Sequence, residues 1–306
     1  MDGNIVSSIS NAEARNFGQN ELPPHDERYD RADEHMAVCD ALWNSWEDDA
    51  LVMDMEAKIF ADPNKVYNVD FVDQHYQTQR PFTVVPSPRR RPFLFQAGQS
   101  DRGRAFAARH AEEIFSAARG VRQMREFSDD MSSRLDDAGR DPSNVPIYWA
   151  AQPIVSKTEA QSRSRFQEIR ERIPIEASRA QMSAHWDPDL SSYDRDAPTT
   201  DLNIPGTRGL FEMYQKSDPN IWLRQIAKTY MSGIDRSPFV GTAEQVADAM
   251  EHALESGGGN GFQISPPYYA PDYYADLVDL LVPELRRRGR HRKDYSGATL
   301  ADHVRD

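Results

Sequence analysis

A glycine-containing loop, FQAGQSDRGR at residues 95–104, has residue types suited to binding a phosphate group. It joins an apolar run to a helical pattern. Gly98 allows a tight turn, and Ser100 stands where it can cap the helix. The first amides of a helix have no intrahelical partner, so together with the Ser100 hydroxyl they can hold a phosphate, with Arg102 and Arg104 adding positive charge. The alternative is a capped strand-to-helix turn without a ligand.

A second candidate is the entrance of an early helix, with the sequence PPHDERY at residues 23–29. His25 and Tyr29 are four residues apart, which places both on one helix face. An imidazole beside a phenol can hydrogen-bond the polar atoms of a planar ligand. An ordinary charged helix start is the alternative. A metal site with His35 and the neighbouring aspartates is disfavoured, because these acids fall on several faces of the helix.

Five short apolar runs are typical of buried strands that would position these residues. Each is followed by a loop and a helical pattern. The runs are residues 4–8, 92–97, 112–116, 145–150 and 261–265. Alternating strands and helices predict an α/β fold with a parallel sheet and helices outside it, either open or closed into an eight-stranded barrel. No G-x-G-x-x-G follows the first run, which disfavours a dinucleotide-binding fold.

Two stretches interrupt this alternation within what we expect to be a single domain over residues 1–306. Residues 63–91 and 183–239 are predicted to be irregular insertions, and long insertions commonly have a binding or lid role. The helices outside them show clearer signals. Tyr29 opens a helical pattern that reaches residue 46, and Thr242 with Gln245 forms a capping box for a late helix that ends at a run of three glycines.

Composition limits the classes of partner. The 306 residues carry a net charge of −13, which argues against nonspecific binding to nucleic acid or to anionic membranes. Cys39 is the single cysteine, so an internal disulfide is excluded and a reducing, cytoplasmic setting is expected. No run of apolar residues is long enough to cross a bilayer.

Several longer motifs resemble one known family. They are NIVS at residues 4–7, NAEARNFG at 11–18, HDERY at 25–29, WNSWEDDA at 43–50, RP at 91–92, QAGQS at 96–100, FVGT at 239–242, GFQ at 261–263 and VPEL at 282–285. In combination they resemble the bacterial luciferase-like, flavin-dependent monooxygenases. The similarity is to the branch with nitrilotriacetate monooxygenase component A, dibenzothiophene sulfone monooxygenase and pristinamycin synthase, and it extends over nearly the whole chain.

The resemblance implies a fold, a cofactor and partners. The fold would be a TIM-type (β/α)8 barrel, with the site after the strand ends. The cofactor would be reduced FMN, delivered by a separate NAD(P)H:flavin oxidoreductase and used with dioxygen to oxygenate a small organic substrate, without a metal. His25, Tyr29 and Ser100 match positions that contact FMN, Ser100 at the phosphate, and His25 is the candidate catalytic residue. A homodimer is expected.

The chain also departs from the family pattern. Members of the family carry three further strand–helix units before the strand expected at residues 4–8. We therefore expect an N-terminally truncated, incomplete barrel with about five of eight units, in agreement with the independent count of apolar runs. Two functions remain open at this point: an FMN-dependent monooxygenase, or a truncated, catalytically inactive remnant that binds flavin or associates with a full-length homologue.

Overall fold

The central element of the protein is a sheet of five parallel strands, in the order β1–β6–β7–β8–β11. The computed structural model describes residues 2–118, 120–186, 189–201, 218, 220–232 and 239–305. The strands are β1 (Asp2–Asn4), β6 (Phe93–Gln96), β7 (Glu113–Ser116), β8 (Ile147–Ala151) and β11 (Gly261–Ile264). Four of the predicted runs contain a strand, whereas the run predicted at residues 4–8 shares only Asn4 with β1, which begins at Asp2. The parallel α/β fold is thereby confirmed for the described residues, with β1 and β11 at the sheet edges.

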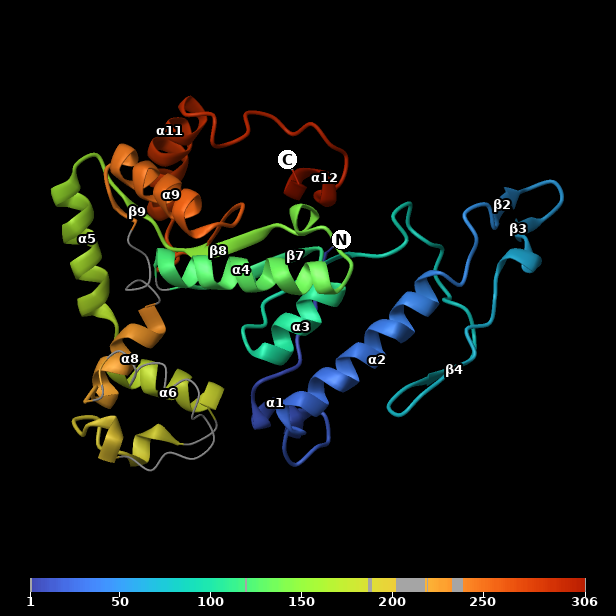
Figure 1. Cartoon of the computed structure of the whole chain (residues 1–306), viewed down its shortest axis with the longest axis horizontal. Helices are drawn as coiled ribbons and strands as arrows, with labels where there is room; N and C mark the ends of the chain where they lie inside the picture. The colour runs from blue at the N-terminus through green and yellow to red at the C-terminus, as the bar shows by residue number, and fades with distance from the viewer. Residues whose placement is uncertain are drawn as a thin grey trace.

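Helices follow these strands as the alternation predicts. The longer ones are α2 (His25–Trp43), α3 (Asp101–His110), α4 (Val121–Asp137), α5 (Glu159–Arg172), α6 (Ile175–Trp186) and α9 (Ala243–Gly257). The C-terminal region has α10 (Pro271–Asp276), the π-helical segment η6 (Leu277–Leu281), α11 (Val282–Arg287) and α12 (Leu300–Arg305). Figure 1 shows α4 and α9 beside the sheet, α3 next to α4, and α2 beyond α3, which is the order in which they make contact. A short helix, α1 (Asn11–Asn16), precedes α2.

Local sequence signals explain where two of these helices begin. The hydroxyl of Ser100 accepts a hydrogen bond from the amide of Gly103, which confirms it as the cap of α3. Thr242 and Gln245 form the predicted capping box of α9, and the helix ends at Gly257, followed by the cap residue Gly258 with a positive φ of 79°. A positive φ is easy for glycine and costly for other residues. The residue types at these ends therefore fix the helix limits.

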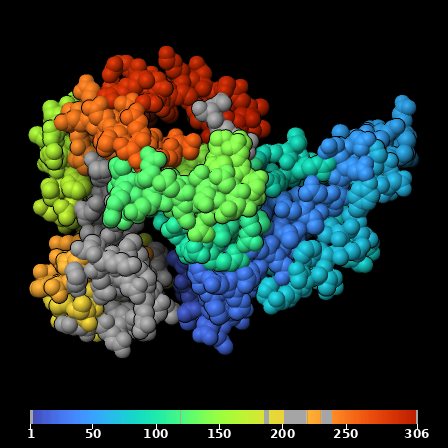
Figure 2. All heavy atoms as spheres, viewed as in Figure 1, coloured from blue at the N-terminus to red at the C-terminus, as the bar shows by residue number. Residues whose placement is uncertain are grey.

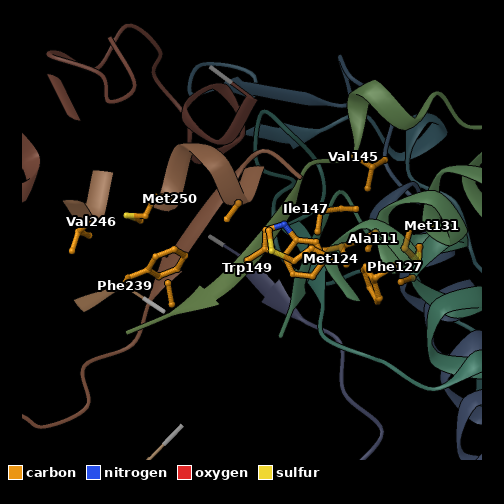
Figure 3. Close-up of a cluster of buried hydrophobic side chains, with 14 of the residues drawn as sticks. Ala111, Met124, Phe127, Met131, Val145, Ile147, Trp149, Phe239, Val246 and Met250 are labelled. Carbon is orange, nitrogen blue, oxygen red and sulfur yellow. The ribbon is translucent and has the colours of Figure 1, made fainter. Parts of the chain in front are cut away.

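The largest apolar core lies where α4 and α9 pack on β7 and β8. Trp149 is at its centre with 2% of its surface exposed (Figure 3). Its ring lies edge-on to Phe127 at 5.6 Å between centroids, and its indole N–H donates to the carbonyl of Gly258 at 2.9 Å. Met131 and Leu135 of α4 are fully buried in the same cluster. Burial of such large side chains is a major source of stability in this half of the molecule.

The segments outside the sheet are more regular than predicted. Two antiparallel hairpins follow α2: β2 (Leu51–Asp54) with β3 (Ile59–Ala61), and β4 (Phe71–Val72) with β5 (Gln77–Thr78), with a 3₁₀ turn η1 (Pro63–Lys65) between them. They extend away from the body of the molecule (Figure 2). The prediction that residues 63–91 form an irregular insertion misses η1 and the β4–β5 hairpin, because such short strands leave little trace of periodicity.

The second insertion, residues 183–239, is described only in part. It contains the turns η3 (Leu190–Ser192) and η4 (Thr199–Asp201) and the helix α8 (Leu223–Ser232), whose apolar side packs on α6. The prediction of an irregular stretch is therefore wrong for α8. Residues 187–188, 202–217, 219 and 233–238 lie outside the described residues, and the suggested lid role falls largely on them. Two further short strands, β9 (Ile154–Val155) and β10 (Val240–Gly241), pair in parallel beside this region. Across the described ranges, no helix combines the length and the apolar character needed to cross a bilayer.

Candidate functional site

The loop between β6 and α3 is held rigidly by its own side chains. Gln96, which is buried, accepts a hydrogen bond from the amide of Gly98 at 2.6 Å through its Oε1 atom. Gln99 donates from Nε2 to the hydroxyl of the buried Ser116 at 3.2 Å. Ser100 is extended, with φ −68° and ψ 161°, and its Oγ accepts from the amide of Gly103 at 3.0 Å. The N-terminus of α3 is therefore preorganised.

A close approach at Gly103 brings two hydroxyl groups together. A Cβ atom at this position would lie 2.7 Å from the hydroxyl oxygen of Tyr29 and 3.0 Å from Oγ of Ser100. It would also lie 3.1 Å from the Cα of Gly98. The absence of a side chain at Gly103 thus lets α2 present its phenol at the first turn of α3. The hydroxyl groups of Tyr29 and Ser100, which were predicted from separate motifs, therefore both lie next to Gly103.

His25 completes this group on the open side. It is the first residue of α2, and its ring centroid is 5.1 Å from that of Tyr29. The side chain of His25 is 46% exposed, so a ligand can reach it, while Tyr29 is 7% exposed. The carboxylate of Asp26 is 2.7 Å from Nδ1 of His25 and orients the ring. On its inner side, the ring of Tyr29 lies 5.6 Å from that of Phe106 on α3. The three candidate residues are therefore neighbours in the fold.

The two arginines of the loop do not supply the free positive charge expected from the sequence. Arg104 binds Asp130 of α4 at 3.0 Å and donates from Nε to the carbonyl of Gln99 at 2.9 Å. Arg102 binds Asp30 at 2.7 Å and Asp33 at 2.6 Å, both on α2. The expectation is corrected on this point: both guanidinium groups are neutralised by carboxylates from neighbouring helices.

Asp33 is a residue of this region that the sequence interpretation missed. Its Oδ2 accepts from Arg102 and from Arg109, each at 2.6 Å, and its Oδ1 is 2.7 Å from Nε2 of His110. Burial acts to raise the pKa of Asp33, but hydrogen bonds from His110 and Arg102 and the nearby charges of Arg109 and Arg102 outweigh it and hold the pKa below its usual value. Its spacing of four residues from Tyr29 places both on one helix face, but that spacing does not indicate the partners of Asp33 on α3.

A hollow of about 510 Å³ lies beside the entrance of α2, between that helix and the segment after β1. Arg28 lines this hollow and donates hydrogen bonds to the carbonyl oxygens of Ser7, at 3.2 Å, and of Ser8. The other lining side chains are apolar, aromatic, polar or charged, and they include Val6, Glu13, Phe17, Leu22, Arg31, His35 and Tyr76. Such a lining suits a small organic molecule more than a metal ion. Within the part of the chain that the structure describes, no three His, Cys, Asp or Glu residues are grouped so that they could hold a metal.

The donor set at α3 fits the phosphate end of a flavin mononucleotide. It consists of the Ser100 hydroxyl, the Tyr29 hydroxyl and the first amides of the helix, which have no intrahelical acceptor. A helix N-terminus also favours negative charge. His25 is exposed next to these donors, so its imidazole is accessible to a ligand bound there. The geometry can therefore hold a phosphorylated planar molecule with an imidazole beside it.

Comparisons with known proteins show which family the chain resembles. The family model described as luciferase-like monooxygenase matches residues 2–261. The dibenzothiophene-sulfone monooxygenase of Rhodococcus erythropolis is 37% identical, over 98% of this chain and 68% of that protein. The nitrilotriacetate monooxygenase component A of Aminobacter aminovorans is 30% identical, over 98% and 67% of the two chains.

Solved structures show the same fold. The crystal structure of a long-chain alkane monooxygenase superposes with a TM-score of 0.83 at 31% identity, over 99% of this chain and 66% of that one. A riboflavin lyase with modified FMN and substrate riboflavin gives a TM-score of 0.85 at 27% identity, over 97% and 65% of the two chains. These matches confirm the luciferase-like barrel class of the α/β fold.

The chain spans about two thirds of the length of these relatives. The prediction of an N-terminal truncation is not supported by the comparisons, in which nearly the whole chain aligns. The prediction of an incomplete barrel is likewise unconfirmed: the described residues form a parallel sheet of five strands.

Proposed function

Because the chain belongs to the family of luciferase-like monooxygenases, we propose that it is an FMN-dependent monooxygenase that uses reduced FMN and dioxygen to oxygenate a small organic substrate. Three of the relatives named above bear the name monooxygenase, which supports the class of reaction. The observation that carries the cofactor is the convergence of the Tyr29 and Ser100 hydroxyls at the first turn of α3. The modified FMN named for the similar riboflavin lyase supports the same assignment.

Each candidate residue has a distinct role in this proposal. Ser100 and the first amides of α3 bind the phosphate, and Tyr29 adds a second hydroxyl at the same place. The carboxylate of Asp26 accepts from Nδ1 of His25, so Nδ1 carries the proton of the neutral ring, and we assign ligand contact to the free Nε2. The bound flavin supplies the electrons for dioxygen activation. The buried ring of Tyr29, packed on Phe106, keeps water from the inner side of the site.

Partners and assembly belong to the same proposal. The name component A, borne by the Aminobacter aminovorans relative, supports a separate partner component, which we assign as an NAD(P)H:flavin oxidoreductase that supplies reduced FMN. We further propose a homodimer of single-domain chains in the cytoplasm, with no nucleic acid or membrane partner. The five-stranded sheet is proposed to be part of the eight-stranded barrel of the family.

The phosphate assignment is tested by removing one hydroxyl. Ser100→Ala should weaken FMN binding by about 1–2 kcal/mol, the size of a charge-assisted hydrogen bond, and should change riboflavin binding little, because riboflavin lacks the phosphate. The matched control is Thr242→Ala, which removes the equivalent cap from α9, far from the candidate residues in sequence and on another helix. Flavin fluorescence titration gives all affinities. Equal losses for FMN and riboflavin in Ser100→Ala would mean that the residue only supports the fold.

Turnover is tested separately from binding. With a flavin reductase, NADH and FMN, we expect oxygen from ¹⁸O₂ to appear in a small organic product, with a panel of sulfones, sulfides, alkanes and aminocarboxylates as substrates. His25→Ala should lower the yield of product per NADH while leaving the melting temperature nearly unchanged, since an exposed residue at a helix start contributes little packing. Tight FMN binding without labelled product from any substrate would favour the flavin-binding remnant.

A further inference from the structure

We propose that Asp33 is a positioning residue for the flavin-phosphate site, because its carboxylate fixes Arg102 and thereby holds Tyr29 against the first turn of α3. The proposal rests on the proposed function, since it concerns the same site. It adds a residue outside the three candidates, on the side of Tyr29 away from His25.

The carboxylate of Asp33 engages both ends of α3. It binds Arg102 in the first turn of that helix, and Arg109 and His110 at its end. The distances to the three donors are 2.6, 2.6 and 2.7 Å. A carboxylate with two well-placed oxygens can accept several such bonds at once. Asp33 therefore fixes how α3 lies along α2 over the full length of α3.

Arg102 connects Asp33 to Tyr29. The guanidinium carbon of Arg102 lies 5.6 Å from the centroid of the Tyr29 ring, within the range of a cation–π contact. The ring is also bounded by Phe106 at 5.6 Å and His25 at 5.1 Å. Its hydroxyl reaches the first turn of α3 beside Ser100. Arg102 is therefore one of the side chains that hold the Tyr29 ring in place, and a shift of Arg102 would allow the Tyr29 hydroxyl to move.

Exposure distinguishes Asp33 from its neighbour Asp30. Both carboxylates bind Nη2 of Arg102, at 2.6 and 2.7 Å. The side chain of Asp30 is 66% exposed, whereas those of Asp33 and Arg102 are each 20% exposed. Solvent and salt screen an exposed ion pair much more than a shielded one. Asp33 is therefore the partner that orders Arg102, and Asp30 is a matched control with the same chemistry.

A competing effect has the opposite sign. If Arg102 acted on the ligand only through its charge, neutralising Asp33 would leave that charge less compensated and would strengthen the attraction for a phosphate. If Asp33 acts through position, its loss weakens phosphate binding even though the site becomes more positive. The sign of the change in FMN affinity thus decides between the two.

The experiment is a double-mutant cycle of Asp33→Asn and Tyr29→Phe, with Kd values for FMN and riboflavin from fluorescence titration. Tyr29→Phe keeps the ring and removes the hydroxyl. We expect each single variant to lower the preference for FMN over riboflavin by about tenfold, and the double variant to lower it no further, because both changes remove the same phosphate contact. Asp30→Asn should change this preference by less than about threefold.

Each outcome has a definite meaning. Tighter FMN binding by Asp33→Asn, or a loss in the double variant equal to the product of the single losses, would overturn the positioning role. Equal losses for FMN and riboflavin would overturn it too, since they indicate a general effect on the fold. If Asp33→Asn does not fold, Arg102→Gln tests the same link, and an unchanged FMN preference in that variant overturns the proposal. A wild-type chain that binds FMN no better than riboflavin would refute the proposed phosphate site itself, and Asp33 with it.

Discussion

Two halves of the molecule are stabilised by different interactions. Where α4 and α9 cover the sheet, the contacts are apolar and centre on Trp149 and Phe127. Where α2 meets α3, the apolar cluster is small, and carboxylates of α2 connect the elements: Asp33 to α3, and the buried Glu34 to the β4–β5 hairpin. Apolar contacts do not depend strongly on the orientation of the side chains, whereas hydrogen bonds and ion pairs require their donor and acceptor atoms to lie at defined positions. The candidate ligand site lies in the half where position is fixed by polar contacts.

The largest effect is expected from the apolar half. Trp149→Ala should lower the free energy of unfolding by about 3–5 kcal/mol, because it leaves a large cavity and an unpaired carbonyl at Gly258. Urea unfolding followed by circular dichroism measures the loss. Trp222→Ala is the matched control, since Trp222 is 37% exposed and should cost much less. Similar losses in the two variants would contradict the division between the halves.

An intermediate effect is expected at Glu34. Its carboxylate accepts hydrogen bonds from the backbone amide of His75, at 2.8 and 3.0 Å, and from that of Tyr76, at 2.6 Å. Glu34→Gln replaces one accepting oxygen by a donor, so stability should fall by about 1–3 kcal/mol. Hydrogen exchange followed by mass spectrometry should show faster exchange in the β4–β5 hairpin, while α4 and α9 keep their protection. Exchange that rises evenly over all of these elements would show that the polar contacts are not local.

The smallest effect is a dependence on pH. The lowered pKa of Asp33 means that its ionised form is stabilised by folding, starting from an ordinary value of 3.8. That contribution is fully present above this value and disappears as the pH falls through the lower pKa of the folded state. The stability difference between the wild type and Asp33→Asn should therefore shrink as the pH falls below about 4. Urea midpoints at several pH values measure it, and a difference that grows on acidification would have the wrong sign.

The sheet and the helix ends were predictable because they depend on local residue types. Four of the five apolar runs contain a strand, the first run overlaps β1 only at Asn4, and the caps Ser100 and Thr242 were visible from the residues around them. The hairpin β2–β3 was not predicted, because its side chains are mostly exposed and the apolar pattern that marks a buried strand is absent. The helix α8 was missed within a stretch whose overall composition suggested a loop.

For the site, the sequence motifs predicted which residues take part but not how these residues are arranged in space. The residues of α2 and of the β6–α3 loop could be selected separately, but their meeting at Gly103 depends on the packing of the two helices. The role of Asp33 depends on partners 69 to 77 residues away, and the same holds for the neutralisation of Arg102. Such long-range ion pairs follow from tertiary structure and not from the spacing of charges along one helix.

The most direct test of the phosphate site is a crystal structure of the chain with FMN. We predict a phosphate oxygen at about 2.6–3.0 Å from Oγ of Ser100, with the Tyr29 hydroxyl and the first amides of α3 as further donors and the isoalloxazine ring extending toward His25. Phosphate density elsewhere on the molecule, or no FMN at a saturating concentration, would contradict it.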